Sequence, residues 1–420
     1  MGYVFIVLGA VIVGLVLYQL AQHLFRGLAM ERISKVQGNL QLKLLTAQIE
    51  VLKEKHRELE DLNASSWNGF RKFIVKEIRR DVKNVASVLL APHDGKKLPP
   101  FKPGQFLTFN LRIPGQDKPV IRCYSLSCGP NPETFRVTVK KVLANPKDPN
   151  GKSGLSSTYF NEALKEGEIL DVKAPSGSFF LDLYQSRPVV LIGGGIGITP
   201  VFSMLKAIAD RKDDRETWLF YGVRSGEEVV HKEEILELAS VMKNLKVLFC
   251  YSDPVAGEVE GKDFQVHGRV SVDLFKKTLP SNNYSFYVCG PPPMMESITS
   301  NLKEWGVPDT NIFFEAFGFA TVKKAATPAS DVSPAKGHRV FFSRSKVEKN
   351  WDGTSMSLLE LAEQNSISIP SGCRTGNCGT CLVAVKSGSV SYLHEPGMKP
   401  DAGTCLTCVG VPNGPVEIDA

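Results

Sequence analysis

The sequence predicts a multidomain protein in which a helical N-terminus precedes β and α/β domains, and three observations lead to this prediction. Residues 3–25 form an apolar stretch without Lys, Arg, Asp or Glu. The middle of the chain changes from short alternating strands to strands that alternate with helices. Near the C-terminus, three cysteines share one glycine-rich loop. The chain has 420 residues, which is enough for about two to four domains.

The apolar stretch at residues 3–25 is long enough for a helix that crosses a hydrocarbon core of about 30 Å. It lacks the positive n-region and the small-residue cleavage site of a signal peptide. The first charges, beginning with Arg26, follow it, so the positive-inside rule places the rest of the chain on the cytoplasmic side. We expect residues 1–27 to be a single-pass transmembrane anchor in an inner or cytoplasmic membrane. A buried core helix is the alternative.

Residues 28–66 predict a helical or coiled-coil spacer. Between residues 28 and 63 there is no Pro and one Gly, Gly38. Two short hydrophobic registers have coiled-coil spacing but do not join in phase, so a stutter is needed between them. Two or three heptads are short for a coiled coil, and a homodimer through residues 28–63 therefore stays open.

Residues 67–185 predict an antiparallel β-barrel. The segment contains many short strands separated by turns, and residues 135–142, Phe-Arg-Val-Thr-Val-Lys-Lys-Val, alternate with a period of two. Short strands at regular spacing favour a barrel.

Residues 186–320 predict a parallel-sheet α/β domain, because apolar strands such as Val189–Ile192 alternate with helical segments. Residues 321–336 are rich in Ala, Pro, Ser and Lys and predict a linker. Residues 337–420 remain for a small C-terminal domain.

Composition limits the kinds of partner. The net charge is +6 and charged residues make up 22% of the chain, with no basic stripe that interleaves aromatic residues. Nucleic acid is therefore not an expected partner. Five of the nine cysteines fall in the last 48 residues and the other four are scattered, so we expect reduced thiols on the cytosolic side and not the disulfides of a secreted protein.

The cysteine-rich loop predicts a plant-type [2Fe–2S] cluster. Cys373, Cys378 and Cys381 have C-x4-C-x2-C spacing, and Cys408 supplies a fourth thiol. A zinc knuckle or disulfides are the alternative, but zinc sites usually pair two distant C-x2-C units.

A glycine loop predicts a phosphate-binding turn. It follows the apolar strand at residues 189–192 and opens a helix, so glycines and free N–H groups can approach a pyrophosphate. The third glycine of the usual pattern is replaced by Pro200, and a plain tight turn is the alternative. The candidate residues are Gly193, Gly194, Gly195, Gly197, Thr199 and Pro200.

Two further segments carry side chains that suit a phosphate and a flat ring. Arg122 and Tyr124 alternate on one strand and are followed by Ser125, so the first two project from the same face. Gly154 and Ser157 lie at a probable helix start and predict a second anion site.

Together these motifs make the chain resemble the ferredoxin–NADP reductase superfamily. The matching motifs are Arg122-x-Tyr124-Ser125, Gly154-x-x-Ser157, Gly193 to Pro200, Cys289-Gly-Pro-Pro-Pro-Met and Glu315-Ala-Phe317. A flavin domain, a nucleotide domain and a C-terminal ferredoxin domain follow one another in phthalate dioxygenase reductase-like enzymes. The resemblance covers about residues 67–420. It implies a flavin-binding barrel, an NAD(P)H-binding domain at 186–320 and a β-grasp [2Fe–2S] ferredoxin domain at 337–420.

The resemblance also implies residue roles. Arg122 would neutralise a flavin phosphate, Tyr124 would pack on the flavin, and Ser125 would hydrogen-bond near its reactive nitrogen. Gly154 and Ser157 would hold the pyrophosphate of FAD, although FMN stays open. Thr199 and Cys289 would line the nicotinamide pocket, and Phe317 would cover the isoalloxazine ring. Cys408, in the family's L-T-C-x-x-x-P pattern, is expected to be the fourth cluster ligand in preference to Cys405.

The choice of nicotinamide depends on two residues that follow strands. Arg224 could bind the 2′-phosphate of NADPH, whereas Asp253 would repel it. We expect NADH, with NADPH as the alternative.

The expected function is a membrane-anchored reductase with its catalytic domains in the cytoplasm. Electrons would pass from NADH through FAD to the cluster and then to a membrane oxygenase, hydroxylase or desaturase. One alternative is a respiratory subunit that feeds electrons to quinone or to a membrane complex. A redox sensor acting through the 28–63 helix is another.

Overall fold

The computed structural model falls into two compact units, Met1–Asn63 and Ala64–Ala420, which we describe separately. The residues that the structure describes are 2–67, 69–144, 153–315, 337–352, 357–372, 374, 376, 379–393, 396 and 400–420.

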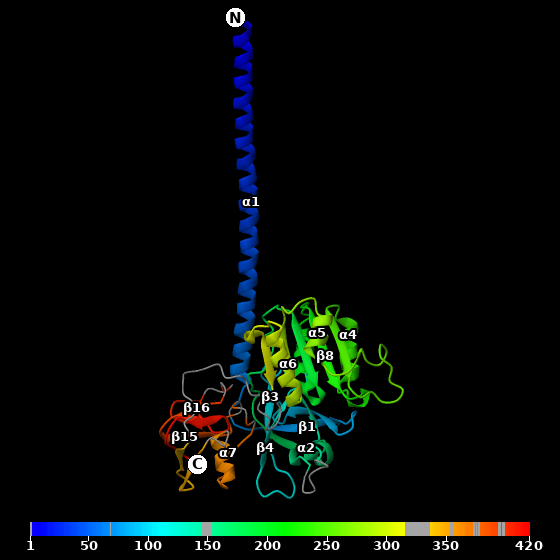
Figure 1. The fold of residues 1–420 in the computed structure, drawn as a ribbon, viewed down its shortest axis with the longest axis vertical. Coiled ribbons are helices and arrows are strands. Elements are labelled where there is room, and N and C mark those ends of the chain that lie inside the picture. Colours follow the sequence, from blue (N-terminus) through cyan, green and yellow to red (C-terminus); the bar gives the residue numbers. More distant parts are fainter. Residues whose placement is uncertain are drawn as a thin grey trace. The chain divides into compact units, whose positions relative to one another are not determined.

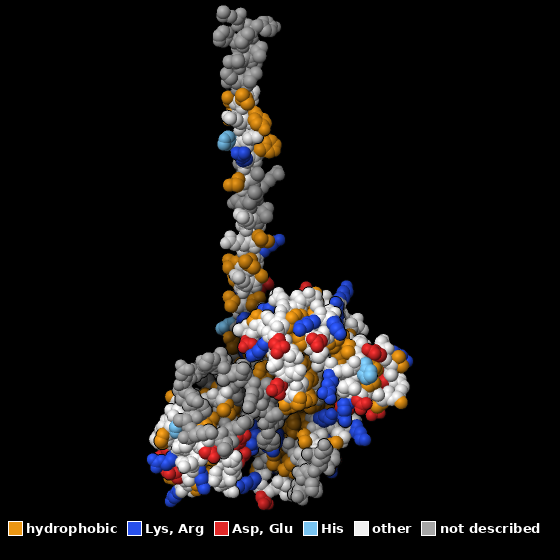
Figure 2. Space-filling view, viewed as in Figure 1, with side chains coloured by type: hydrophobic (Ala, Val, Ile, Leu, Met, Phe, Trp, Pro, Cys, Tyr) orange, Lys and Arg blue, Asp and Glu red, His pale blue; other side chains and the backbone are white. Residues whose placement is uncertain are grey.

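The first unit consists of one helix, α1, which spans Gly2–Ser65 and so continues two residues past the end of the unit. The segment contains no proline, so nothing removes a backbone hydrogen bond along its length. Apolar side chains are exposed along it (Figure 2), among them Leu40 and Leu52. The helix passes without a break through the point where the two hydrophobic registers change phase.

The structure corrects the prediction of a transmembrane anchor at residues 1–27. Among the described residues, no helix combines the length and the apolar composition that crossing a membrane requires. Residues 3–25 do not form a helix of their own, because α1 continues past Arg26 through the charged part of the segment to Ser65. The predicted single-pass location in an inner or cytoplasmic membrane, with catalytic domains facing the cytoplasm, is therefore wrong.

The second unit begins with a closed antiparallel barrel whose sheet order is β4-β3-β6-β1-β2-β5. Leu126, directly after β4, bridges to Val137 of β5, so the first and last strands of this order meet. Its apolar interior includes the rings of Phe73, Phe109 and Phe135. The strands are β1 Arg71–Arg79, β2 Val85–Pro92, β3 Phe106–Leu111, β4 Val120–Ser125, β5 Phe135–Lys140 and β6 Ile169–Val172. This architecture agrees with the barrel that strand spacing predicted.

A parallel sheet follows, with the order β10-β9-β8-β7-β11-β12 and helices on both faces (Figure 1). One apolar cluster packs α3 and α4 on one face, and another packs α5 and α6 on the other. The strands are β7 Val189–Gly194, β8 Thr217–Val223, β9 Leu245–Tyr251, β10 Val266–His267, β11 Ser285–Cys289 and β12 Ile312–Glu315. The helices are α3 Ile198–Asp210, α4 Lys232–Val241, α5 Val272–Thr278 and α6 Pro292–Glu304. The strand order reverses between β7 and β11, where open α/β sheets bind ligands.

The C-terminal part is a small mixed sheet, β14-β13-β19-β15-β17, with one helix and a separate β16-β18 pair. Its apolar cluster includes Cys381, Cys405 and Cys408. The strands are β13 His338–Phe342, β14 Val347–Trp351, β15 Leu382–Ser387, β16 Val390–Tyr392, β17 Thr404–Leu406, β18 Gly410–Pro412 and β19 Val416–Ile418, and the helix is α7 Leu358–Gln364. A short helix on a mixed sheet fits the predicted ferredoxin domain.

Candidate functional site

The predicted flavin strand is β4, where Arg122 is exposed and Tyr124 is half-buried. The Tyr124 hydroxyl lies 2.8 Å from Oγ of Ser156, and its ring packs edge-on against Phe160 at 4.9 Å between centroids. Burial raises the pKa of Tyr124 to about 12, so the phenol stays neutral at pH 7. The structure therefore fixes Tyr124 against the barrel, whereas the Arg122 side chain is exposed, with its Nη1 donating to the Ile121 carbonyl at 2.7 Å.

The predicted pyrophosphate segment begins at Gly154, before the four-residue helix α2 Leu155–Thr158. Ser157 Oγ donates to the Gly154 carbonyl at 2.9 Å and accepts from the N–H of Val142 at 3.0 Å. A Cβ at Gly154 would lie 2.8 Å from that Oγ, so a larger residue would disturb the turn. Thr158 Oγ1 is shielded from solvent and has no hydrogen-bond partner among the described residues. The turn is therefore ordered, and the Thr158 hydroxyl could donate a hydrogen bond to a ligand such as a flavin pyrophosphate.

The glycine loop joins β7 to α3 through the 3-10 turn Gly195–Gly197. Gly195 has a φ of +52°, which glycine adopts without steric cost. A Cβ at Gly197 would lie 2.7 Å from the backbone N of Gly290 and closer still to the Cys289 carbonyl. The N-terminus of α3 has no side-chain cap, so its N–H groups can meet a phosphate. The close approach of Gly197 to Cys289 and the uncapped start of α3 favour the pyrophosphate interpretation of this loop over a plain tight turn.

Two other residues of the loop are buried at the start of α3. Thr199 is 2% exposed, and its Oγ1 donates to the Ile196 carbonyl at 3.0 Å. Pro200 lies in the first turn, where its missing N–H removes no helical bond. Both residues stabilise the turn in which the glycines lie.

Three strands bring one residue each to the same edge of the parallel sheet. Gly193 of β7 pairs with Cys289 of β11, which in turn pairs with Glu315 of β12. Burial, and then the Glu315 carboxylate, raises the pKa of Cys289 well above its usual value, so this residue stays a neutral thiol. Ser125 Oγ lies 3.5 Å from Oε2 of Glu315. Strand β4 of the barrel and this edge of the parallel sheet therefore meet at Ser125 and Glu315.

Glu315 was not among the predicted site residues, although it begins the Glu315-Ala-Phe317 motif. That motif was the signal that could have identified it. Phe317, the predicted cover for the flavin ring, lies outside the described residues.

Arg224 and Asp253 follow β8 and β9, and the Asp253 N–H donates to the Arg224 carbonyl at 2.8 Å. The structure therefore brings them together. Nε of Arg224 donates to Oε1 of Glu228 at 2.8 Å, and the hydrogen bond to Glu228 raises the pKa of Arg224. Sequence patterns had not identified Glu228, because nothing local marks it as a partner.

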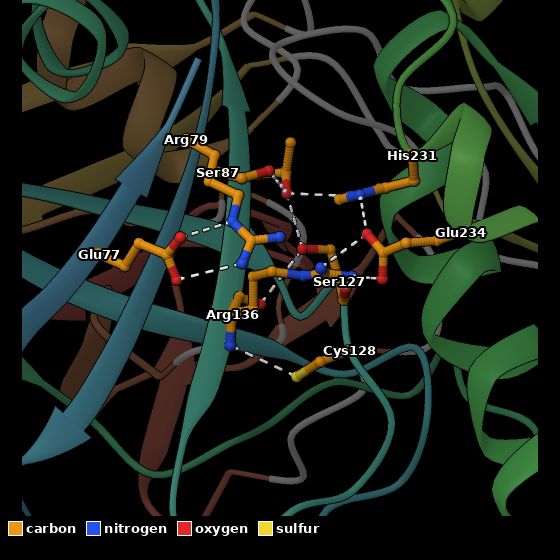
Figure 3. Close-up of polar contacts among 9 residues, drawn as sticks. Glu77, Arg79, Ser87, Ser127, Cys128, Arg136, His231 and Glu234 are labelled. Carbon is orange, nitrogen blue, oxygen red and sulfur yellow. Dashed lines mark hydrogen bonds and ion pairs between the residues drawn. The ribbon is translucent and has the colours of Figure 1, made fainter. Parts of the chain in front are cut away.

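One face of β5 makes three successive polar contacts with residues 228–234, which run from the turn after β8 into the first turn of α4. The pairs are Arg136 with Glu234 at 2.8 Å, Thr138 with His231 at 3.2 Å and Lys140 with Glu228 at 3.5 Å. Alternate residues of a strand share a face, which is why three residues at spacing two can all reach the nucleotide domain. Figure 3 shows Arg136, His231 and Glu234 converging from the two domains.

The hydrogen bonds of His231 define its tautomer. Burial lowers the pKa of His231, and its Nδ1 lies 3.0 Å from the Glu234 carboxylate, which can only accept. Nδ1 therefore carries the proton, and Nε2 accepts from the Thr138 hydroxyl. Thr138 in turn lies 2.7 Å from Ser87 Oγ and 2.8 Å from Ser127 Oγ, which can both donate to it. Every hydroxyl of this group thus has a partner.

A cavity of about 290 Å³ adjoins this contact, and both domains line it. Arg79, Asp81 and Lys232 are among its lining residues, so it holds charges of both signs. None of the predicted cofactor residues lines it.

Two of the four predicted cluster ligands are described. Cys381 and Cys408 are 2% and 7% exposed, whereas Cys373 and Cys378 lie outside the described residues. Within the described ranges, no group of three or more Cys, His, Asp or Glu side chains could hold a metal ion.

The surroundings of Cys381 and Cys408 fit the predicted thiolate set. Thr407 donates to the Cys381 carbonyl through both its N–H and its Oγ1, at 3.2 and 3.1 Å. Gly376 has a φ of +72° and lies so close to Pro396 that a Cβ would be 2.9 Å from it. Position 376 therefore needs glycine, and the residue before Cys408 is hydrogen-bonded to Cys381.

Comparisons with known proteins place three families along the chain. Residues 72–181 match the oxidoreductase FAD-binding domain, residues 191–300 the oxidoreductase NAD-binding domain, and residues 341–413 the 2Fe-2S iron-sulfur cluster binding domain. Curated relatives include the flavohemoprotein of Halalkalibacterium halodurans, 33% identical over 270 residues. That match covers 64% of this chain and 65% of the relative, so the chain spans just under two thirds of that relative's length.

Two solved structures are similar over different parts of the chain. The FAD/NAD-binding domain of a nitric oxide dioxygenase from Vibrio cholerae has 30% identity and a TM-score of 0.53, covering 60% of this chain and all of that one. Phthalate dioxygenase reductase has 23% identity and a TM-score of 0.52, covering 84% of this chain and 98% of that one. At that identity the second match shows the fold, including all three domains.

Proposed function

Since the chain is a ferredoxin reductase-type oxidoreductase with FAD-binding, NAD-binding and 2Fe-2S domains in the order of phthalate dioxygenase reductase, we propose that it oxidises NADH and delivers electrons singly to a partner oxygenase, hydroxylase or desaturase. The succession of the three domains carries this proposal. The bound flavin would supply the change from two-electron to one-electron transfer, and the cluster would supply single-electron transfer.

We assign the flavin-binding roles to the barrel. Arg122 is exposed on β4 and would neutralise a flavin phosphate. Tyr124, held by Ser156 and Phe160, would present its neutral ring to the flavin. Gly154, Ser157 and Thr158 would hold the pyrophosphate, which supports FAD over FMN because FMN has no second phosphate.

We assign the nicotinamide-binding roles to the edge of the parallel sheet. The glycine loop and the start of α3 would bind the dinucleotide pyrophosphate. Thr199 and Cys289 would line the nicotinamide pocket, and Ser125 would orient the flavin ring. Ser125 lies 3.5 Å from Glu315, which supports a pocket shared by the two rings. Phe317 is proposed, from its motif alone, to cover the flavin.

The cluster ligands are proposed to be Cys373, Cys378, Cys381 and Cys408. The two hydrogen bonds from Thr407, the residue before Cys408, to the Cys381 carbonyl support this set, because they hold Cys408 near Cys381. The NADH preference is supported by the ion pair that already engages Arg224.

A single set of assays tests the proposal on purified full-length protein. We expect NADH-dependent reduction of ferricyanide, which accepts electrons from flavin, and of cytochrome c, which depends on the cluster. Cys408→Ser should keep the first activity and lose the second. Negligible turnover with both acceptors in iron- and flavin-loaded wild type would refute the proposal. Reconstitution with a candidate oxygenase should make NADH consumption depend on that oxygenase's substrate.

A further inference from the structure

The end of β8 is the place where a dinucleotide-binding sheet distinguishes NADH from NADPH. β8 neighbours β7, the strand that leads into the glycine loop. In such domains an acidic residue near this point binds the ribose diol, whereas an arginine accommodates a 2′-phosphate. Arg224 is the first residue after β8, so its position alone would favour NADPH.

The guanidinium of Arg224 is already engaged. Its Nε donates to Oε1 of Glu228 at 2.8 Å, and its Nη2 contacts the same oxygen. The Glu228 side chain is 22% exposed, against 72% for Arg224. Nζ of Lys140, from β5 of the barrel, lies 3.5 Å from the other oxygen of Glu228. Glu228 is therefore held between two cations and is charged at neutral pH.

The segment around Arg224 is also fixed by a second carboxylate-bearing loop. Glu258, after β9, accepts hydrogen bonds from the N–H groups of Gly226 at 2.7 Å and Val255 at 2.8 Å. The N–H of Asp253 binds the Arg224 carbonyl at 2.8 Å. The bond to Glu228, and then the nearby charges of Glu228 and Asp253, raise the pKa of Arg224, so two carboxylates act on its guanidinium.

We propose that Glu228 is a specificity-determining residue that makes the chain prefer NADH. Its carboxylate is paired with the Arg224 guanidinium, which a 2′-phosphate would need for its own binding. The dianionic phosphate would have to displace Glu228 and remain beside two carboxylates. The uncharged ribose diol of NADH does not have to displace Glu228 and is not repelled by the carboxylates. Placing a charge against the unwanted ligand is a general route to specificity. This inference deepens the proposed function and rests on it.

The test uses Glu228→Gln, with Glu228→Ala as a second variant in case the first folds poorly. We expect the ratio of kcat/KM for NADPH to that for NADH to rise about tenfold, which corresponds to about 1.4 kcal/mol. The gain should lie in the KM for NADPH and should shrink as salt is added. Isothermal titration with 2′,5′-ADP, which lacks the nicotinamide, should show tighter binding than in wild type, whereas ADP should bind as before.

Two controls make the result specific. Glu227→Gln removes the same charge from the neighbouring exposed residue and should leave both measurements unchanged. The double variant Arg224→Gln/Glu228→Gln should lose the gain, because the cation that binds the phosphate is gone. An unchanged ratio and unchanged 2′,5′-ADP affinity in both Glu228 variants would overturn the inference. Wild type that oxidises neither nucleotide would instead refute the proposed function, and the 2′,5′-ADP titration would still test Glu228.

Discussion

Nη1 of Arg136 lies 2.8 Å from Oε1 of Glu234, joining the flavin barrel to the nucleotide domain across 98 residues of sequence. The Arg136 side chain is 15% exposed and that of Glu234 is 36% exposed. Arg136 also donates to the Ser127 carbonyl at 2.6 Å, so its direction is fixed from its own side. The Arg136 side chain is therefore held in position by its own domain for the ion pair with Glu234 of the nucleotide domain.

Glu234→Gln should weaken this junction. Burial opposes ionisation, but the bonds from His231 and Arg136 prevail and lower the pKa of Glu234 to about 2. After discounting for its exposure, we expect a loss of about 1–2 kcal/mol at pH 7. A lowered carboxyl pKa gives stability that is complete above the unfolded value near 4.5 and is lost as pH falls toward 2. Urea unfolding of wild type and variant should therefore differ at pH 7 and converge toward pH 2.

Glu237→Gln, on the exposed side of α4, is the matched control for Glu234→Gln. An equal loss of unfolding free energy in Glu237→Gln would contradict the assignment.

His231→Asn should reduce the pH dependence of stability in mildly acidic solution. Burial lowers the pKa of His231 below its usual 6.5, so the unfolded chain binds a proton first as pH falls. Wild-type stability should therefore decrease below about pH 6.5, and the variant should lack this component. Asparagine tolerates the left-handed conformation of this position, φ 58°. The measurement is the difference in unfolding free energy between pH 7.5 and 5.5, with the exposed His93→Asn as control. The same difference in wild type and His231→Asn would exclude His231 as its source.

Gly197→Ala should damage the dinucleotide site more than Gly195→Ala. A Cβ at Gly197 would overlap the backbone of Cys289, whereas a Cβ at Gly195 would meet no described atom within 4 Å. Gly195→Ala adds only the cost of a positive φ, about 1–2 kcal/mol. Gly197→Ala must separate two backbone turns, and we expect at least a tenfold rise in the KM for NADH. Ferricyanide reduction measures both variants, and the reverse order of severity would contradict this geometry.

Cys405→Ser should leave the visible cluster spectrum in place, and Cys408→Ser should bleach it. Both thiols are buried, so burial does not separate them. Cys405 lies within β17 and pairs with Val383, whereas Cys408 follows Thr407, which is bonded to Cys381. Iron and acid-labile sulfide analysis should agree with the absorption spectra. A bleached Cys405→Ser protein would reverse the ligand choice.

Ser157→Ala should weaken flavin binding by up to about thirtyfold, since it removes two hydrogen bonds of about 1 kcal/mol each that order the turn at Gly154. Titration of flavin-free protein with FAD measures the effect. FMN, which lacks the second phosphate, should be affected less, and an equal loss for both flavins would argue against a pyrophosphate role.

The sequence predicted best those features that are encoded locally. Alternation at residues 135–142 identified β5, and an apolar strand before glycines located the β7–α3 turn. Side-chain pairs such as Arg136–Glu234 and Arg224–Glu228 were missed, because either charge alone resembles an ordinary surface residue. The anchor prediction failed because no helix of the described residues combines the length and the apolar composition that a membrane span needs, although residues 3–25 contain no Lys, Arg, Asp or Glu. Domain limits and residue roles stay predictions.

Strand β5 has a consequence for how modules of this kind can be exchanged. Its inward residues belong to the barrel, whereas its outward residues are matched to acids and a histidine on the following domain. In a chimera that joined this barrel to a foreign nucleotide-binding domain, Arg136 and Lys140 would lie at the domain interface without their partners Glu234 and Glu228. The two modules therefore have to be transplanted together, or the recipient sequence has to be redesigned at three positions.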